Sequence, residues 1–211
     1  IILGAGYIGL EFGQMFNRFG SKVTIIDKAP RLVPKEDKDV CEEISKIFAQ
    51  DEINTYLDTS VTKVNFENDQ FKVYLEGKSG PKTIEGSHLL VATGRKPNSK
   101  GLGLEDIGVN LTEKGHIAVN ETFETSVPNI YALGDAAGSP PFTHMAYNDA
   151  HIAFRSIYEG DKEISSKGRL LPYCVFIDPQ LARIGTNEQE AIEKNIPYKI
   201  GKFFMKHAGR A

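Results

Sequence analysis

The feature that most constrains the fold is a glycine-rich turn close to the start of the 211-residue chain. Residues 1–3 form a short apolar run, residues 4–9 read Gly-Ala-Gly-Tyr-Ile-Gly, and residues 10–19 show the apolar spacing of a helix that stops at Gly20. The predicted order is therefore strand, tight turn, helix. Such a turn directs a helix N-terminus at open space, where its first amides can face a negative charge.

The three glycines have separate expected roles. Gly4 permits the tight turn, Gly6 lets the backbone approach a pyrophosphate, and Gly9 lets the helix pack closely on the strand. A second strand is expected over 22–27 and ends in Asp27, 18 residues after Gly9, where a carboxylate can read a ribose 2′-hydroxyl. A glycine turn alone also occurs as a packing turn in unrelated α/β domains. Together with both strands and the helix, it predicts a dinucleotide site.

Asp27 also bears on which dinucleotide binds. A carboxylate accepts a hydrogen bond from the 2′-hydroxyl of NAD and repels the 2′-phosphate of NADP. Lys28 and Arg31 stand close enough in the sequence to weaken this preference. NAD is therefore the expected nucleotide, and NADP is the alternative.

Composition gives no indication of a nucleic-acid or membrane partner. The net charge is −3, 40% of the residues are hydrophobic, and the chain contains no long apolar run. The two cysteines, Cys41 and Cys174, are too far apart in the sequence for a metal-ligand or redox-pair spacing, so no metal site is expected. So few cysteines suit a reducing compartment, and we expect a cytoplasmic location.

The next segments predict an α/β nucleotide domain with an inserted β-meander. Residues 37–50 form an amphipathic helix candidate. Short alternating runs separated by turn residues predict three strands, at 60–66, 70–75 and 82–84. Residues 89–92 then read as a buried parallel strand that leads into Thr93-Gly94, where the backbone can approach a ligand.

Another glycine follows an apolar strand further along the chain. Residues 130–138 read Ile-Tyr-Ala-Leu-Gly-Asp-Ala-Ala-Gly, and a helix is expected from Thr143 to Tyr158. Asp135 can accept a hydrogen bond from a ligand hydroxyl while the helix amides meet a phosphate or a ring carbonyl. From the residues alone, a second ligand site and a simple helix cap are equal alternatives.

Four stretches of this chain resemble, in order and approximate spacing, the flavin-dependent pyridine nucleotide-disulfide oxidoreductases, the family that contains dihydrolipoamide dehydrogenase, glutathione reductase and mercuric reductase. The stretches are GAGYIGLEF, ATGRKPN, YALGDAAG and PYCVFIDPQLARIG. The resemblance implies an α/β, Rossmann-like NAD(P)H-binding domain over 1–97, the return segment of an FAD-binding domain over 98–168 and the beginning of an α+β dimerisation domain over 169–211. It also implies FAD and NAD as cofactors and a homodimer.

The resemblance further implies roles for single residues. Tyr7 matches the ring that covers the flavin until nicotinamide displaces it, Glu11 matches the acid near the nicotinamide, and Asp135 matches the contact to the FAD ribityl chain. The other implied cofactor contacts are Gly4, Ala5, Gly6, Ile8, Gly9 and Asp27 at the dinucleotide, Val61 and Gly94 beside it, and Phe142, Thr143 and His144 at the isoalloxazine ring. Plain alternatives stay open for three of them: Tyr7 as a core aromatic, Glu11 as an acid favoured by the helix dipole and His144 as a surface residue.

The chain lacks the CxxxxC pair and the His-Pro segment of the family pattern. No catalytic residue is therefore assigned, and neither Cys41 nor Cys174 is promoted to replace the dithiol. We expect an internal fragment of a longer enzyme that passes hydride from NADH to FAD and on to a dithiol centre, with a disulfide or small-molecule acceptor. The alternatives are a non-catalytic NAD-binding module and a flavin NADH oxidase.

Overall fold

A computed structural model describes residues 1–78, 80–204, 207 and 209 of the chain. The chain divides into two compact units, residues 1–92 with 186–211 and residues 93–185, and each is described by itself. The α/β fold class expected from the sequence is confirmed. The domain limits expected from the sequence concern the family fold and stay predictions.

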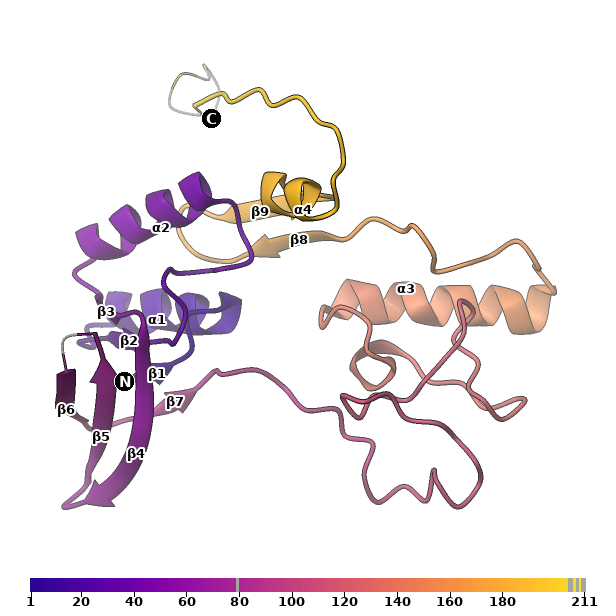
Figure 1. Ribbon diagram of the computed structural model, residues 1–211, viewed down its shortest axis with the longest axis horizontal. Coiled ribbons are helices and arrows are strands. Elements are labelled where there is room, and N and C mark those ends of the chain that lie inside the picture. The colour runs from indigo at the N-terminus through magenta and orange to yellow at the C-terminus, as the bar shows by residue number, and fades with distance from the viewer. Residues whose placement is uncertain (79, 205–206, 208, 210–211) are drawn as a thin grey trace. The chain divides into compact units, whose positions relative to one another are not determined.

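The first unit is built on a parallel sheet with the strand order β3-β2-β1-β7 (Figure 1). Its strands are β1 (Ile2–Leu3), β2 (Thr24–Ile26), β3 (Asn54–Tyr56) and β7 (Leu90–Val91). β1 pairs with β2 on one side and with β7 on the other, so the strand order reverses at β1. Ligands of open α/β sheets bind at the carboxyl ends of the strands beside such a reversal, and the glycine turn follows β1 at this end.

Two helices connect the strands of this sheet. α1 (Tyr7–Arg18) joins β1 to β2, and α2 (Lys38–Gln50) joins β2 to β3. α2 buries Cys41, Ile44 and Phe48, which are three and four residues apart. This spacing puts them on one face of a helix, and covering that face favours the helix here.

The contact of α1 with the glycine turn depends on the absence of a side chain at Gly9. A Cβ atom at residue 9 would lie 2.0 Å from the carbonyl oxygen of Gly4, far inside van der Waals contact. Gly4 itself has a φ of 110°, which residues with a Cβ avoid. The close packing predicted for Gly9 is therefore confirmed.

A β-meander is inserted between β3 and β7, as predicted. It consists of β4 (Thr59–Glu67), β5 (Gln70–Gly77) and β6 (Gly80–Gly86), which pair antiparallel in this order. Val73 and Leu75 of β5 form a buried cluster with Ile26 of β2. The meander is thus fastened to the parallel sheet by apolar contact, which is the main favourable term in packing such layers.

Residues 186–211 belong to the same unit through α4 (Glu188–Glu193). The side chain of Asn187 accepts a hydrogen bond from the backbone N–H of Glu190, 2.9 Å away, and caps this helix. The carboxylate of Asp37, the residue before α2, accepts hydrogen bonds from the backbone N–H groups of Glu188 at 3.2 Å and Gln189 at 2.9 Å. Asp37 therefore ties the beginning of α4 to the beginning of α2.

The second unit contains one long helix, α3 (Thr143–Phe154), which a π-helical turn continues over Arg155–Glu159. A single 3₁₀ turn at Gly134–Ala137 precedes it, and the antiparallel pair β8 (Pro172–Val175) and β9 (Leu181–Ile184) follows. The helix predicted over 143–158 is therefore present, with altered geometry in its last turn.

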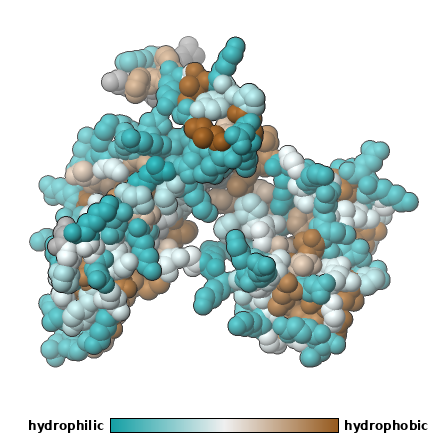
Figure 2. Space-filling view, in the orientation of Figure 1, coloured by the Kyte–Doolittle hydropathy of each residue, from teal (hydrophilic) through white to brown (hydrophobic). Residues whose placement is uncertain are grey.

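Large apolar side chains are exposed in both units, and Figure 2 shows hydrophobic residues among hydrophilic ones on the visible face. Exposed apolar patches commonly mark contacts with other protein surfaces. Among the described residues, no helix is both long and apolar enough to cross a bilayer.

Substitution of Gly9 by Ala is expected to lower the free energy of unfolding by about 3 kcal/mol, because the added Cβ overlaps the Gly4 carbonyl and forces α1 off β1. Urea unfolding of the chain measures this change. Gly6→Ala is the matched control: a Cβ at residue 6 meets no atom within 4 Å, so its effect is expected to stay below about 1 kcal/mol. Equal stability of the two variants would contradict the packing role of Gly9.

Candidate functional site

The glycine turn offers an uncapped helix N-terminus. α1 begins at Tyr7 with Gly6 as its N-cap, and no side chain accepts a hydrogen bond there. Gly6 is exposed and has open space beside its α-carbon. The backbone amides and the dipole at such a terminus favour a bound anion, so the turn fits a pyrophosphate.

Asp27 is anchored on the same turn. Its Oδ2 accepts a hydrogen bond from the backbone N–H of Ala5 at 2.6 Å, and its Oδ1 accepts one from the N–H of Ala29 at 2.7 Å. Each carboxylate oxygen has a second lone pair, so a ribose hydroxyl can still donate to the half-buried group. The structure therefore brings together the two features on which the sequence-based dinucleotide prediction rests.

The two basic residues near Asp27 differ in their surroundings. Arg31 donates from Nη2 to Oε1 of Gln189 on α4, at 2.7 Å, and lies 3.4 Å from the carbonyl oxygen of Pro34. Lys28 is exposed. The guanidinium of Arg31 is therefore engaged by α4.

Tyr7 is held by a residue that the sequence reasoning did not single out. Its phenol hydroxyl donates a hydrogen bond to Oε1 of Glu36 at 2.6 Å, and Glu36 is only 2% exposed. The backbone N–H of Val33 donates to the carbonyl of Ala5 at 2.9 Å, so the loop that carries Glu36 lies against the glycine turn. Only the folded chain reveals this pair, because nothing local to either residue marks it.

The other residues predicted to contact the nucleotide have positions in the fold that do not by themselves indicate a ligand. Ile8 and Glu11 follow Tyr7 on α1. Val61 packs against the cluster of Ile26, Val73 and Leu75, which is a structural role. Gly94 has a φ of 122° and open space beside its α-carbon. Their cofactor contacts stay predictions.

Asp135 joins two of the sequence motifs in the second unit. Its Oδ2 lies 2.8 Å from Nη1 of Arg95, in the ATGRKPN stretch, and its carbonyl oxygen lies 3.0 Å from Nδ1 of His116. The Arg95 and Asp135 side chains are 67% and 47% exposed, so water weakens this ion pair and a ligand hydroxyl can compete for the carboxylate. Arg95 lies in one of the four sequence motifs, whereas no sequence pattern pointed to His116.

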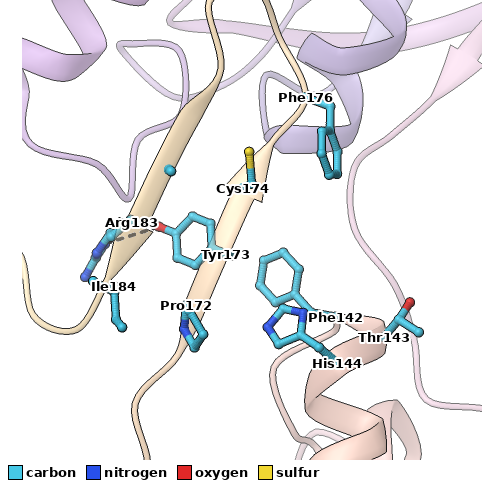
Figure 3. A pocket seen from close by; sticks show the side chains of 10 residues that line it. Phe142, Thr143, His144, Pro172, Tyr173, Cys174, Phe176, Arg183 and Ile184 are labelled. Carbon is cyan, nitrogen blue, oxygen red and sulfur yellow. Dashed lines mark hydrogen bonds between the residues drawn. The ribbon is translucent and has the colours of Figure 1, made fainter. Parts of the chain in front are cut away.

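Phe142, Thr143 and His144 line an open cavity of about 720 Å³ (Figure 3). The remaining lining residues come from β8, β9 and the turn between them, and they are Pro172, Tyr173, Cys174, Phe176, Ala182, Arg183 and Ile184. The Phe142 ring stacks on Tyr173 with centroids 5.2 Å apart and on His144 at 5.5 Å, with interplanar angles of 13° and 28°. A cavity of this size lined by parallel rings suits a flat aromatic ligand.

α3 begins beside this cavity. Phe142 is its N-cap residue, and no side chain caps the helix. The helix dipole therefore favours partial negative charge, such as a ring carbonyl, near Thr143. Sequence reasoning found this wall of the cavity and missed Tyr173 on the other, because two strands far along the chain supply it.

The two thiols have different environments. Cys41 is buried in the first unit, its Sγ lies 3.4 Å from the carbonyl oxygens of both Val33 and Glu36, and burial raises the pKa of its thiol. Cys174 is a half-buried wall residue of the cavity in the second unit. Within the described ranges, no three His, Cys, Asp or Glu side chains are grouped so that they could hold a metal ion.

Two family models match this chain. A family model described as pyridine nucleotide-disulphide oxidoreductase matches residues 1–150, and its dimerisation-domain model matches residues 171–211. This chain belongs to the pyridine nucleotide-disulphide oxidoreductase family. The resemblance seen in the four sequence stretches is therefore confirmed, and homologues in this family use FAD and NAD(P)H.

Several relatives in this family match over nearly the whole chain. The dihydrolipoyl dehydrogenase of Vibrio cholerae is 34% identical over 100% of this chain and 44% of its own length. The Cu(II) complex of the HOCl-induced flavoprotein disulfide reductase RclA from Escherichia coli superimposes with a TM-score of 0.84 and 34% identity, over 92% of this chain and 43% of that one. LpdA from Mycobacterium tuberculosis gives a TM-score of 0.82 and 28% identity, over 92% and 41%. The chain thus spans less than half the length of these relatives.

Alkylation is expected to distinguish the two thiols of this chain. At pH 8, iodoacetamide is expected to modify Cys174 at least about tenfold faster than Cys41, because burial and a raised pKa keep Cys41 protonated and inaccessible. Mass spectrometry of the folded chain measures both rates. The rates should become similar in urea, and Cys174→Ser should leave the native chain almost unmodified. Rapid native labelling of Cys41 would contradict its buried position.

Proposed function

We propose that this chain carries the NADH-binding site and part of the FAD-binding site of a flavin-dependent disulfide oxidoreductase. In the whole enzyme, hydride would pass from NADH to FAD and then to a dithiol or disulfide centre supplied by residues outside this chain. The observation that carries the proposal is the uncapped glycine turn with the Asp27 carboxylate bonded to it, at the carboxyl end of the central strand.

At the nucleotide, residues 4–9 bind the pyrophosphate through backbone amides, and Asp27 accepts a hydrogen bond from the ribose 2′-hydroxyl. The hydrogen bond from Arg31 to Gln189 supports NADH over NADPH, because it holds the guanidinium on α4, although the positive charge is kept. Val61 and Gly94 are proposed to line the site. Tyr7 and Glu11, on the first turns of α1, are proposed to lie near the nicotinamide.

In the second unit, Asp135 accepts a hydrogen bond from a ribityl hydroxyl of FAD. Phe142, Thr143 and His144 contact the flavin ring, and the stacked rings and the uncapped N-terminus of α3 support this placement. When bound, FAD supplies the two-electron chemistry, and the chain's own residues supply binding, orientation and electrostatics.

The oligomeric state and the electron acceptor are inferred from the family and its relatives. The match of residues 171–211 to a dimerisation domain supports a homodimer in the whole protein. The names of the relatives support a disulfide or a related small molecule as acceptor. The low cysteine content supports a cytoplasmic location.

The cofactor proposal predicts a preference for NADH that depends on Asp27. The wild-type chain is expected to bind NADH at least about tenfold more tightly than NADPH, and Asp27→Ala is expected to reduce this ratio to about one, because the mutation removes both the 2′-hydroxyl acceptor and the repulsion of a 2′-phosphate. Isothermal titration with each nucleotide measures the ratio.

The ratio is the proper readout, since Asp27 also holds the amides of Ala5 and Ala29 and its loss can weaken binding of both nucleotides. Lys28→Ala serves as the control and is expected to leave the preference for NADH in place. An NADPH preference in the wild type, or a ratio unchanged in Asp27→Ala, would overturn the cofactor assignment.

The flavin proposal predicts that the ring of Phe142 contributes to FAD binding. Phe142→Leu keeps an apolar side chain but removes the stack with Tyr173, so FAD affinity is expected to fall by about threefold to tenfold while NADH affinity stays the same. Titration followed by flavin fluorescence measures the change. A loss of affinity for both ligands would indicate general unfolding instead.

A further inference from the structure

The second unit contains a fully buried carboxylate that the proposed cofactor contacts do not use. Asp149 lies on the buried face of α3 with Met145 and Ile152 and has an exposure of 0%. Its Oδ2 accepts a hydrogen bond from the backbone N–H of Gly134 at 2.8 Å, and its Oδ1 pairs with the guanidinium of Arg169. A carboxylate removed from water needs such partners, because burial of an unpaired charge is strongly unfavourable.

Arg169 has further partners besides Asp149. Its Nη1 also donates to Oδ1 of Asn148 at 2.9 Å, and its Nη2 donates to Oγ of Ser139 at 3.1 Å. The guanidinium carbon lies 5.4 Å from the centre of the Phe123 ring. The planar fork of an arginine can satisfy several acceptors at once, which a lysine ammonium cannot do with the same geometry.

These contacts join the three segments that carry the proposed flavin contacts. Gly134 directly precedes Asp135, and Ser139 lies on the loop that leads to Phe142. Arg169 itself lies four residues before Tyr173, whose ring stacks on Phe142. The pair therefore connects the turn of Asp135 with both walls of the cavity, although neither member of the pair lines that cavity.

We propose that Asp149 and Arg169 are positioning residues that fix the turn at 134–137, the loop before α3 and the segment leading into β8 relative to one another. In this way the pair sets the separation of the cavity walls and the direction of the Asp135 turn. The positioning role depends on the proposed function only for the identity of the ligand, which would be the flavin ring in the cavity.

A charged pair at Asp149 and Arg169 suits a positioning role better than an apolar pair would. Apolar side chains in place of a buried ion pair are often as stabilising or more so, but they would leave the Gly134 N–H without its acceptor. The charged pair satisfies that amide and links two further segments through directional hydrogen bonds. A nearby pair, Lys167 with Glu121 at 3.8 Å, has both side chains exposed and offers a matched control.

The deciding variant is Arg169→Lys, which keeps the positive charge and removes the fork. Amide hydrogen exchange is expected to speed up by about tenfold or more over 134–137 and 170–175, with residues 1–92 unchanged, because local opening no longer has to break several charge-assisted hydrogen bonds. The FAD affinity of the same chain is expected to fall by a similar factor, since the separation of the cavity walls is no longer fixed.

Asp149→Asn with Arg169→Gln gives the rescue. The Asn amide keeps an acceptor for Gly134 and can pair with the Gln amide, so the double variant is expected to exchange more slowly than either Asp149→Asn or Arg169→Gln alone. Lys167→Gln is expected to match the wild type. Because the neutral pair leaves no charge buried, the rescue remains informative even if Arg169→Lys fails to fold.

Wild-type exchange rates in Arg169→Lys, or an equal increase in both units, would overturn the positioning role, and so would absence of rescue in the double variant. If FAD affinity is unchanged in Arg169→Lys while exchange speeds up over 134–137 and 170–175, the flavin assignment of the cavity fails, and the local exchange pattern still shows that the pair positions its walls.

Discussion

The first unit depends on one close contact, the approach of Gly9 on α1 to the carbonyl of Gly4 after β1. Only residues without a Cβ allow it, since a Cβ at residue 9 would stand 2.0 Å from that oxygen. The contact seats the helix on the sheet and directs its N-terminus at open space. The anchoring of Asp27 on Ala5 and of the Val33 loop on the same turn both build on this arrangement.

The second unit is organised by a different interaction. Its two small apolar clusters, around Val109 and around Phe123, are joined by irregular chain with few regular strands. Local geometry there cannot come from sheet pairing alone. A buried ion pair with directional hydrogen bonds makes up for the scarce sheet pairing. Its hydrogen bonds fix the relative orientation of the segments, whereas apolar contact only holds them together. The aromatic stack at the cavity adds to this order.

Much of the fold and part of the candidate site could be predicted from the chain. The strand, turn, helix and acid of the candidate dinucleotide site follow from local patterns, and so does the meander, since alternation and turn residues act over a few positions. The partners of the site residues could not be predicted. Glu36 on Tyr7, Arg95 on Asp135 and Tyr173 on Phe142 are separated by 29 to 40 residues, and no local pattern encodes such contacts.

The sequence by itself determined the family, the α/β class and the place of the glycine turn, because glycine spacing and apolar periodicity limit the backbone locally. Only the tertiary structure decided which side chains are engaged. Arg31 donates a hydrogen bond to Gln189 of α4, Asp37 accepts one from the backbone of that helix, and Asp149 is buried in an ion pair with Arg169. These contacts form between segments that are distant in the sequence and that exclude water where they meet. Burial there sets the strength of each ion pair and hydrogen bond.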